Sequence, residues 1–286
     1  FQFPWDIITS VIVSNDNAKI MVSGRTTAAR VVTSAVATCL RSLPELTELV
    51  CSVKSFQQVN FVKASFNLQG QKFVYVGQYM SYATVSLFNS SDNTVQNFVY
   101  SAASTSSVTL SQVQSPQAFV GSFVSGTCVD SSASLANAIF AGWLRTDTGQ
   151  MAGAMSVAPV SGSIVSTTDL VNAMALEDTG PDSFIAGGLQ LSDGVGVNAY
   201  VVRANALYKN VLYGMRYVPR AARRRMLSSS TGATRSVARG MVLTHGSLFM
   251  ILDVFQAGNR TSVVVLRLHP ATGVITKQVQ VSAPNA

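Results

Sequence analysis

Apolar and polar residues alternate with a period of two along most of the chain, in segments only a few residues long. Residues 83–88, 199–203 and 263–268 are clear examples. Short segments that contain Asp, Asn, Pro or Gly separate them, as at 147–149 and 270–273. Alternation with a period of two, interrupted by turn residues about every 8–12 positions, is typical of antiparallel strands. The pattern therefore predicts an all-β protein.

One apolar segment that ends in a small residue recurs along the chain. It reads Met-Val-Ser-Gly at 21–24, Val-Tyr-Val-Gly at 74–77, Phe-Val-Ser-Gly at 123–126 and Phe-Ile-Ala-Gly at 184–187, and a fifth copy at 249–252 lacks the Gly. We interpret this segment as the first strand of a repeat, crowded against its neighbours at a central channel where only Gly fits. A polar loop, an alternating strand and a turn follow each copy.

Four strands in a unit of about 40–60 residues is the arrangement of a propeller blade. We therefore predict a β-propeller of about five four-stranded blades that forms one domain over residues 1–286. The predicted repeats span approximately 7–57, 58–111, 112–165, 166–240 and 241–286. Helical spacing also fits residues 32–43 and 135–143, but the Val- and Tyr-rich equivalents in the last two repeats favour strands.

Closure of the propeller has two interpretations. Residues 7–13 have no earlier strand to complete a blade, and residues 274–281 end the last repeat. These two strands are expected to complete one blade between them, because a closed ring leaves no free edge. The alternative is a partial propeller within a longer chain. Because the sequence opens on Phe1 rather than Met, we expect either a removed leader or a piece of a longer polypeptide.

The segment Phe-Ile-Ala-Gly at 184–187 is followed after a loop by Asn-Ala-Tyr-Val-Val-Arg at 198–203, and residues 268–273 form a turn that contains Pro270 and Gly273. Through these segments the chain resembles, over nearly its whole length, the tandem β-propeller repeats of secreted and cell-surface proteins. The Asp that usually precedes the Ala-Phe-Val step of that family is Asn137 or Asn198 here. The resemblance implies a structural or adhesive role in an extracellular or surface-associated assembly.

Charge is scarce and unevenly placed. Only 12% of the residues are charged, about half of the usual share, and the mean hydropathy is +0.30. No apolar stretch reaches the roughly 18 residues that a membrane-spanning helix needs, so we predict no membrane span. Seven of the 20 basic residues lie between Arg216 and Arg239 without any acidic residue, which leaves 13 basic and 13 acidic residues elsewhere. The basic isoelectric point thus reports one segment, and nucleic-acid binding is not predicted.

That segment contains Arg220, Arg223, Arg224 and Arg225, followed by a Ser-rich stretch. Its length suggests an insertion between strands. We interpret it as a solvated basic loop. The alternatives are docking onto an acidic protein partner or a polyanionic glycan, and proteolytic processing after the three consecutive arginines.

Three features favour the secretory pathway. Cys39 and Cys51 lie symmetrically about a turn near Pro44, so their side chains would face each other in a hairpin of that register. They are candidates for a disulfide, and the alternative is two buried thiols that pack as small apolar groups. Asn89 and Asn259 match the N-glycosylation pattern and fall in predicted loops. Low charge completes the argument for an extracellular or cell-surface location.

Catalytic motifs are lacking. The chain has two His and neither a Gly-x-Ser-x-Gly nor a His-Glu-x-x-His motif. A glycosidase would need two converging carboxylates, for which the candidates are Asp6, Asp16, Asp130, Asp182, Asp193 and Asp253. We predict a non-enzymatic structural or interaction module without cofactor or metal, which contacts protein partners or copies of itself. The alternatives are a carbohydrate-binding or glycoside-cleaving propeller and an intracellular scaffold.

Overall fold

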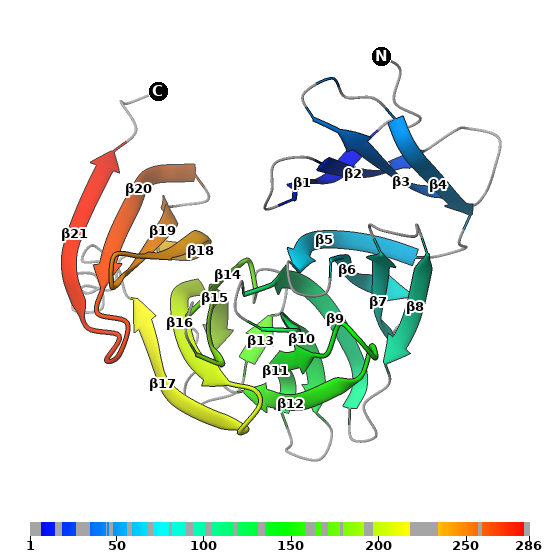
Figure 1. Cartoon of the computed structure of the whole chain (residues 1–286). Helices are drawn as coiled ribbons and strands as arrows, with labels where there is room; N and C mark the ends of the chain where they lie inside the picture. The colour runs from blue at the N-terminus through cyan, green and yellow to red at the C-terminus, as the bar shows by residue number, and fades with distance from the viewer. Residues whose placement is uncertain are drawn as a thin grey trace, which may run out of the picture. The chain divides into compact units, whose positions relative to one another are not determined.

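A computed structural model gives the fold of the chain (Figure 1). The structure describes residues 7–14, 19–26, 35–43, 45, 48–55, 59–67, 71–79, 82–89, 94–100, 105–116, 119–130, 135–157, 164–166, 171–177, 180–191, 197–217, 234–256 and 259–282. These residues form strands and turns, so the all-β prediction is confirmed. None of them forms a helix that could cross a membrane.

Antiparallel strands follow one another in five sheets. The first sheet contains β1 (Ile7–Val13), β2 (Lys19–Thr26), β3 (Ala35–Ser42) and β4 (Glu48–Ser55). The second contains β5 (Val59–Asn67), β6 (Lys72–Tyr79), β7 (Tyr82–Asn89) and β8 (Val95–Tyr100). The third contains β9 (Thr105–Gln114), β10 (Ser122–Asp130), β11 (Leu135–Leu144) and β12 (Met151–Val157).

The fourth sheet departs from this plan at its first strand. Two short strands, β13 (Ile164–Ser166) and β14 (Ala173–Leu176), both pair with β15 (Asp182–Leu191). The sheet continues through β16 (Val197–Asn205) and β17 (Asn210–Tyr217). The fifth sheet contains β18 (Thr234–Thr244), β19 (Ser247–Gln256), β20 (Asn259–Leu268) and β21 (Ile275–Ser282).

Two expectations about the strands have definite outcomes. The segments at 32–43 and 135–143 contain strands β3 and β11, as the interpretation against helix expected. The expectation that residues 7–13 and 274–281 share one blade was wrong. Strand β1 pairs with β2 in the first sheet and β21 pairs with β20 in the fifth, so each completes a sheet of its own. The expected repeat boundaries near 111 and 240 fall inside β9 and β18.

The recurring Gly segment is the second strand of each sheet, which corrects its interpretation as a first strand. Its Gly lies inside the strand rather than at its end. Gly24 pairs with Ile8 and Gly77 with Phe61, and in both cases the first strand then gains one unpaired residue. Such bulges bend a strand, and Gly is frequent where a bulge or a close backbone approach occurs.

The chain divides into two compact units. One comprises Phe1–Val124 with Gly142–Ala152, and the other comprises Ser125–Ala141 with Gly153–Ala286. In the first unit, mostly aromatic side chains of β2, β5, β6 and β7 form one core, which includes Met21, Ala64, Phe66, Phe73 and Tyr75.

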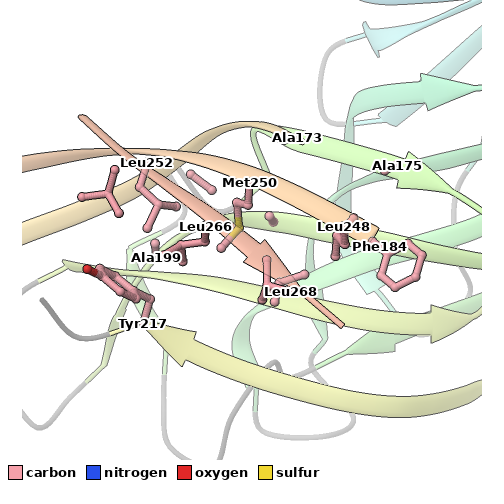
Figure 2. Packing of buried hydrophobic residues seen from close by; sticks show 14 of the residues in the cluster. Ala173, Ala175, Phe184, Ala199, Tyr217, Leu248, Met250, Leu252, Leu266 and Leu268 are labelled. Carbon is pink, nitrogen blue, oxygen red and sulfur yellow. The ribbon is translucent and has the colours of Figure 1, made fainter. Parts of the chain in front are cut away.

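In the second unit, the fourth and fifth sheets bury a larger core between them (Figure 2). The fourth sheet contributes mostly small side chains, such as Ala173, Ala175 and Ala199. The fifth contributes Leu and Met side chains, such as Met250 and Leu266. Large residues opposite small ones let two sheet faces interlock without voids.

Candidate functional site

The turn between β16 and β17 exposes apolar side chains. Leu207, Tyr208, Val211 and Leu212, which we name the hairpin surface, are 39%, 74%, 41% and 46% exposed. They are four of the 15 exposed large apolar side chains in the described part of the chain, and they lie within six consecutive residues. Single exposed apolar residues are common on proteins, whereas a cluster of them indicates a contact surface.

A hydrogen-bonded turn holds this surface in place. The side-chain oxygen of Asn205 accepts a hydrogen bond from the backbone N–H of Tyr208 at 3.0 Å. The amide nitrogen of Asn205 donates to Oδ1 of Asp182 at 2.6 Å, across the β15–β16 pair. Lys209 has a φ of 54° and closes the turn. Asn and Asp side chains stabilise turns in this way.

Arg203 anchors Asp182 from the other side. Its Nε donates to Oδ2 of Asp182 at 2.8 Å, and its Nη2 lies 2.6 Å from the same oxygen. Both side chains are largely buried, with 14% and 10% exposure. Nη2 also donates to Glu177 Oε2 at 3.1 Å, and Nη1 donates to the carbonyl of Pro270 at 3.2 Å. Breaking such a buried pair is costly, so the network fixes the turn that carries the hairpin surface.

The neighbouring strand β12 also supports this turn. A Cβ added to Gly153 would lie 2.5 Å from the carbonyl oxygen of Ala206 and 2.9 Å from Cα of Leu207. Gly153 thus permits a close backbone approach between β12 and the turn. The hairpin surface therefore rests on ordered backbone on one side and on the Asp182–Arg203 network on the other.

Two turns at equivalent positions in other sheets expose different chemistry. Residues 145–150 of the third sheet and 269–274 of the fifth share the same pair of backbone hydrogen bonds, at 2.8–2.9 Å. Their exposed tips carry Asp147 with Thr148, and Ala271 with Thr272. A third-to-fourth-strand turn of this fold therefore does not require Leu and Tyr. The exposed Leu207 and Tyr208 are therefore particular to the turn of the fourth sheet.

The predicted carboxylates do not form a catalytic pair in the described part of the chain. Asp182 belongs to the arginine network, and Asp253 pairs with Arg239 at 3.1 Å. The side chain of Asp130 lies outside the described residues, as do the predicted candidates Asp6, Asp16 and Asp193. The described residues also contain no group of three or more His, Cys, Asp or Glu that could hold a metal.

The predicted cysteine and sequon positions have definite places in the strands. Cys39 and Cys51 are direct partners across the β3–β4 pair, the register on which the sequence argument depended. Asn89 ends β7 and Asn259 begins β20, so the expectation that both lie in loops was wrong; both lie at strand ends. Arg220, Arg223, Arg224 and Arg225 lie outside the described residues.

Solved structures resemble the chain over nearly its whole length. The hydrazine synthase of Kuenenia stuttgartiensis matches with a TM-score of 0.62 and 9% identity, over 99% of this chain and 68% of that one. The Dos1 propeller matches with a TM-score of 0.52 and 7% identity, over 95% of this chain and 70% of that one. The Cps50 (Swd1) β-propeller domain of Myceliophteria thermophila matches with a TM-score of 0.51 and 9% identity, over 98% of this chain and 88% of that one.

These similarities and the successive four-stranded antiparallel sheets define the fold as a β-propeller, and the predicted fold class is confirmed. At identities below 10% they define the fold alone, because one fold carries many functions. No protein-family model matches the sequence, and no curated protein matches it.

Proposed function

We propose that this β-propeller is a non-catalytic interaction module that binds a protein partner through the hairpin surface. The observation that carries the proposal is the clustered exposure of Leu207, Tyr208, Val211 and Leu212 on a turn held by buried polar contacts. Exposed Tyr on a rigid support is typical of binding hot spots, since little side-chain entropy is lost when the partner covers it.

The polar groups around the turn support this proposal. Asp182, Glu177 and Arg203 are the ionisable residues beneath it, and they bind one another. Because these carboxylates bind a guanidinium and an amide, they stabilise the turn. The chemistry left at the surface is apolar, with the charge of Lys209 beside it. Such a surface suits a protein contact better than a polar small molecule.

Site-specific photocrosslinking tests the proposal. A photoreactive phenylalanine analogue replaces Tyr208 in the full chain, and a second protein carries it at Val281, which is 61% exposed on β21. We expect irradiation with material from the source organism to give a discrete protein adduct at position 208 and none at 281. The double substitution Leu207→Ser and Leu212→Ser should remove that adduct. Equal labelling at both positions, or none at 208, would refute the proposal.

We further propose that the module acts in an extracellular or surface-associated assembly. The low charged fraction and the resemblance to secreted and cell-surface repeats support this location. So does the direct pairing of Cys39 with Cys51 across two strands. Asn89 and Asn259, at strand ends beside short connections, are the candidate glycosylation sites.

A further inference from the structure

Strand β17 is the outermost strand of the fourth sheet. Among the described strands it pairs with β16 alone. The outer edge of such a strand offers backbone N–H and C=O groups that another extended segment can pair with. Residues 210–215 contain no charged residue and no Pro, which are the usual means of protecting an edge.

The side chains of β17 divide between the core and the surface. Tyr213 and Met215 pack against the core of the fourth and fifth sheets, and Tyr217 is buried in it. Val211 and Leu212 are exposed. The register shifts so that Tyr213 pairs with Arg203 and Val211 with Ala204, which leaves Leu212 as a bulge without a partner on β16. An added strand would therefore find apolar side chains beside the outer edge of β17.

The charged residues of β17 and of the turn before it are all basic. Lys209 and Arg216 are the charged residues of the segment 206–217, and no acidic residue follows until beyond Arg239. The acidic residues beneath the turn, Asp182 and Glu177, bind Arg203. A positive surface attracts an acidic partner and repels a basic one. Complementary charge also fixes the register in which the partner binds and raises the rate of association.

We infer that the ligand of β17 is an extended, acidic and apolar segment of the partner protein, which adds to the fourth sheet as a further strand. Its apolar side chains cover the hairpin surface, and its carboxylates lie near Lys209. The inference rests on the proposed function, and it names the chemical class of the partner.

Fluorescence anisotropy with synthetic peptides tests this inference on the full chain. The probe is a fluorescein-labelled, end-capped decapeptide that alternates Glu with Val and Leu. One control peptide has Lys in place of each Glu, and the other has Pro in place of every second apolar residue. We expect the Glu peptide to bind, more weakly as salt is added, and both control peptides to bind at least about fivefold more weakly. Equal binding of the Lys peptide or of the Pro peptide would overturn the inference.

Protein variants locate the site. Tyr208→Ser and Lys209→Glu should each weaken binding of the Glu peptide by about fivefold or more. Val281→Ser is the matched control, since it also removes an exposed apolar side chain from an outermost strand, β21 of the fifth sheet. We expect it to leave binding unchanged. Circular dichroism of each variant confirms that the fold is kept. Equal loss in all three variants would contradict the assignment to β17.

The outcomes separate this inference from the proposed function. If no peptide binds but crosslinking at position 208 still captures a partner, the edge-strand inference fails and the interaction surface stands. If Tyr208→Ser instead converts an oligomer to a monomer in sedimentation, the occupant is a second copy of the chain and the acidic-segment inference is overturned. If neither peptide binding nor crosslinking occurs, both fail.

Discussion

Tyr213 and Tyr217 lie four residues apart on β17, and their hydroxyl groups have different environments. Gln278 Nε2 donates to the Tyr217 hydroxyl at 3.1 Å. The Tyr213 hydroxyl is buried and has no hydrogen-bond partner among the described residues. A buried polar group without a partner lowers stability, whereas a satisfied one contributes about 0.5–1.5 kcal/mol.

We therefore expect Tyr213→Phe to leave the free energy of unfolding unchanged or to raise it by up to about 1 kcal/mol. Tyr217→Phe should lower it by about 0.5–1.5 kcal/mol, because Gln278 loses its acceptor. Urea unfolding followed by circular dichroism measures both. A loss in Tyr213→Phe as large as in Tyr217→Phe would contradict this account.

Alkaline pH gives a second readout of the same variant. Burial raises the pKa of Tyr213 to about 12, although the positive charge of Arg203 acts in the opposite direction. An unfolded Tyr titrates near pH 10, so the native state holds this proton more tightly than the unfolded state does. The stability that this tighter binding of the proton contributes is complete below about pH 10 and is lost as pH rises towards 12. The Tm of the wild type should fall more steeply over this range than that of Tyr213→Phe.

The partners of single residues were the least predictable part of the site. Asp182 was a candidate catalytic carboxylate in the sequence, yet it binds Arg203 and Asn205. These contacts join residues 21 and 23 positions apart, and they depend on the β15–β16 register, which pairs Asp182 with Asn205. Alternation of residue types shows which positions share a face of a strand, but it does not show the register between strands.

At the scale of elements, glycines in turns join one sheet to the next. Gly273, in the turn of the fifth sheet, has a φ of 72°, and an added Cβ would lie 2.7 Å from the ring of Tyr213 in the fourth sheet. Gly149, in the equivalent turn of the third sheet, has a φ of 70° and would meet the ring of Phe98. The same contact thus occurs twice, and each time an aromatic side chain of a fourth strand packs under the turn of the next sheet.

Gly246 provides a control for this contact, because its φ is 64° but an added Cβ would meet nothing within 4 Å. Gly246→Ala should therefore show only the backbone cost of a left-handed residue, about 1 kcal/mol. Gly273→Ala should lose that amount and a further 1–3 kcal/mol or so for the steric overlap. Thermal unfolding compares the two. If Gly246→Ala destabilises as much as Gly273→Ala, the contact with Tyr213 contributes nothing.

The sequence predicted the elements well and their roles less well. The Gly segments at 74–77 and 184–187 were recognised as strands, but as first rather than second strands. In the fourth sheet the place of the first strand is shared by β13 and β14, which are short and interrupted, so their alternation is too weak to detect. Sequence reasoning missed the hairpin surface, because exposed Leu and Tyr residues fit the alternation of apolar and polar positions as well as buried ones do. The signal available was Leu207-Tyr208 at a turn whose equivalents carry Asp, Thr and Ala.

At the scale of the whole molecule, four of the five described sheets have the predicted four strands and the fourth sheet has five, and the structural relatives are β-propellers. The fold class was accessible because a repeat reports the same alternation several times. The compartment and the partners could not be predicted in the same way, since they depend on a few residues that do not recur from repeat to repeat. Cys39 and Cys51 are the most direct route to the compartment.

Their pairing across β3 and β4 gives a testable outcome for the protein secreted from a eukaryotic host. Residues directly opposite each other on antiparallel strands have Cα atoms about 4.5–5.5 Å apart, within the range that a disulfide spans. We expect oxidised protein to be lighter than reduced protein by the mass of two hydrogens, with residues 39 and 51 in one linked peptide. Cys128, which is buried, should remain a thiol. Enzymatic removal of N-glycans should lower the mass further through Asn89 and Asn259.

The disulfide between residues 39 and 51 is also expected to stabilise the fold. The loop closed by residues 39 and 51 is short, so the disulfide should add about 2–4 kcal/mol to the free energy of unfolding, chiefly by restricting the unfolded chain. Cys39→Ser and Cys51→Ser should each remove this gain, and reduction should then have no further effect on either variant. Cys128→Ser should keep the sensitivity to reductant. Full alkylation of residues 39 and 51 without reductant would show that the strands hold two thiols. The low charge of the chain would then no longer indicate secretion, because an intracellular scaffold would also have a low charge.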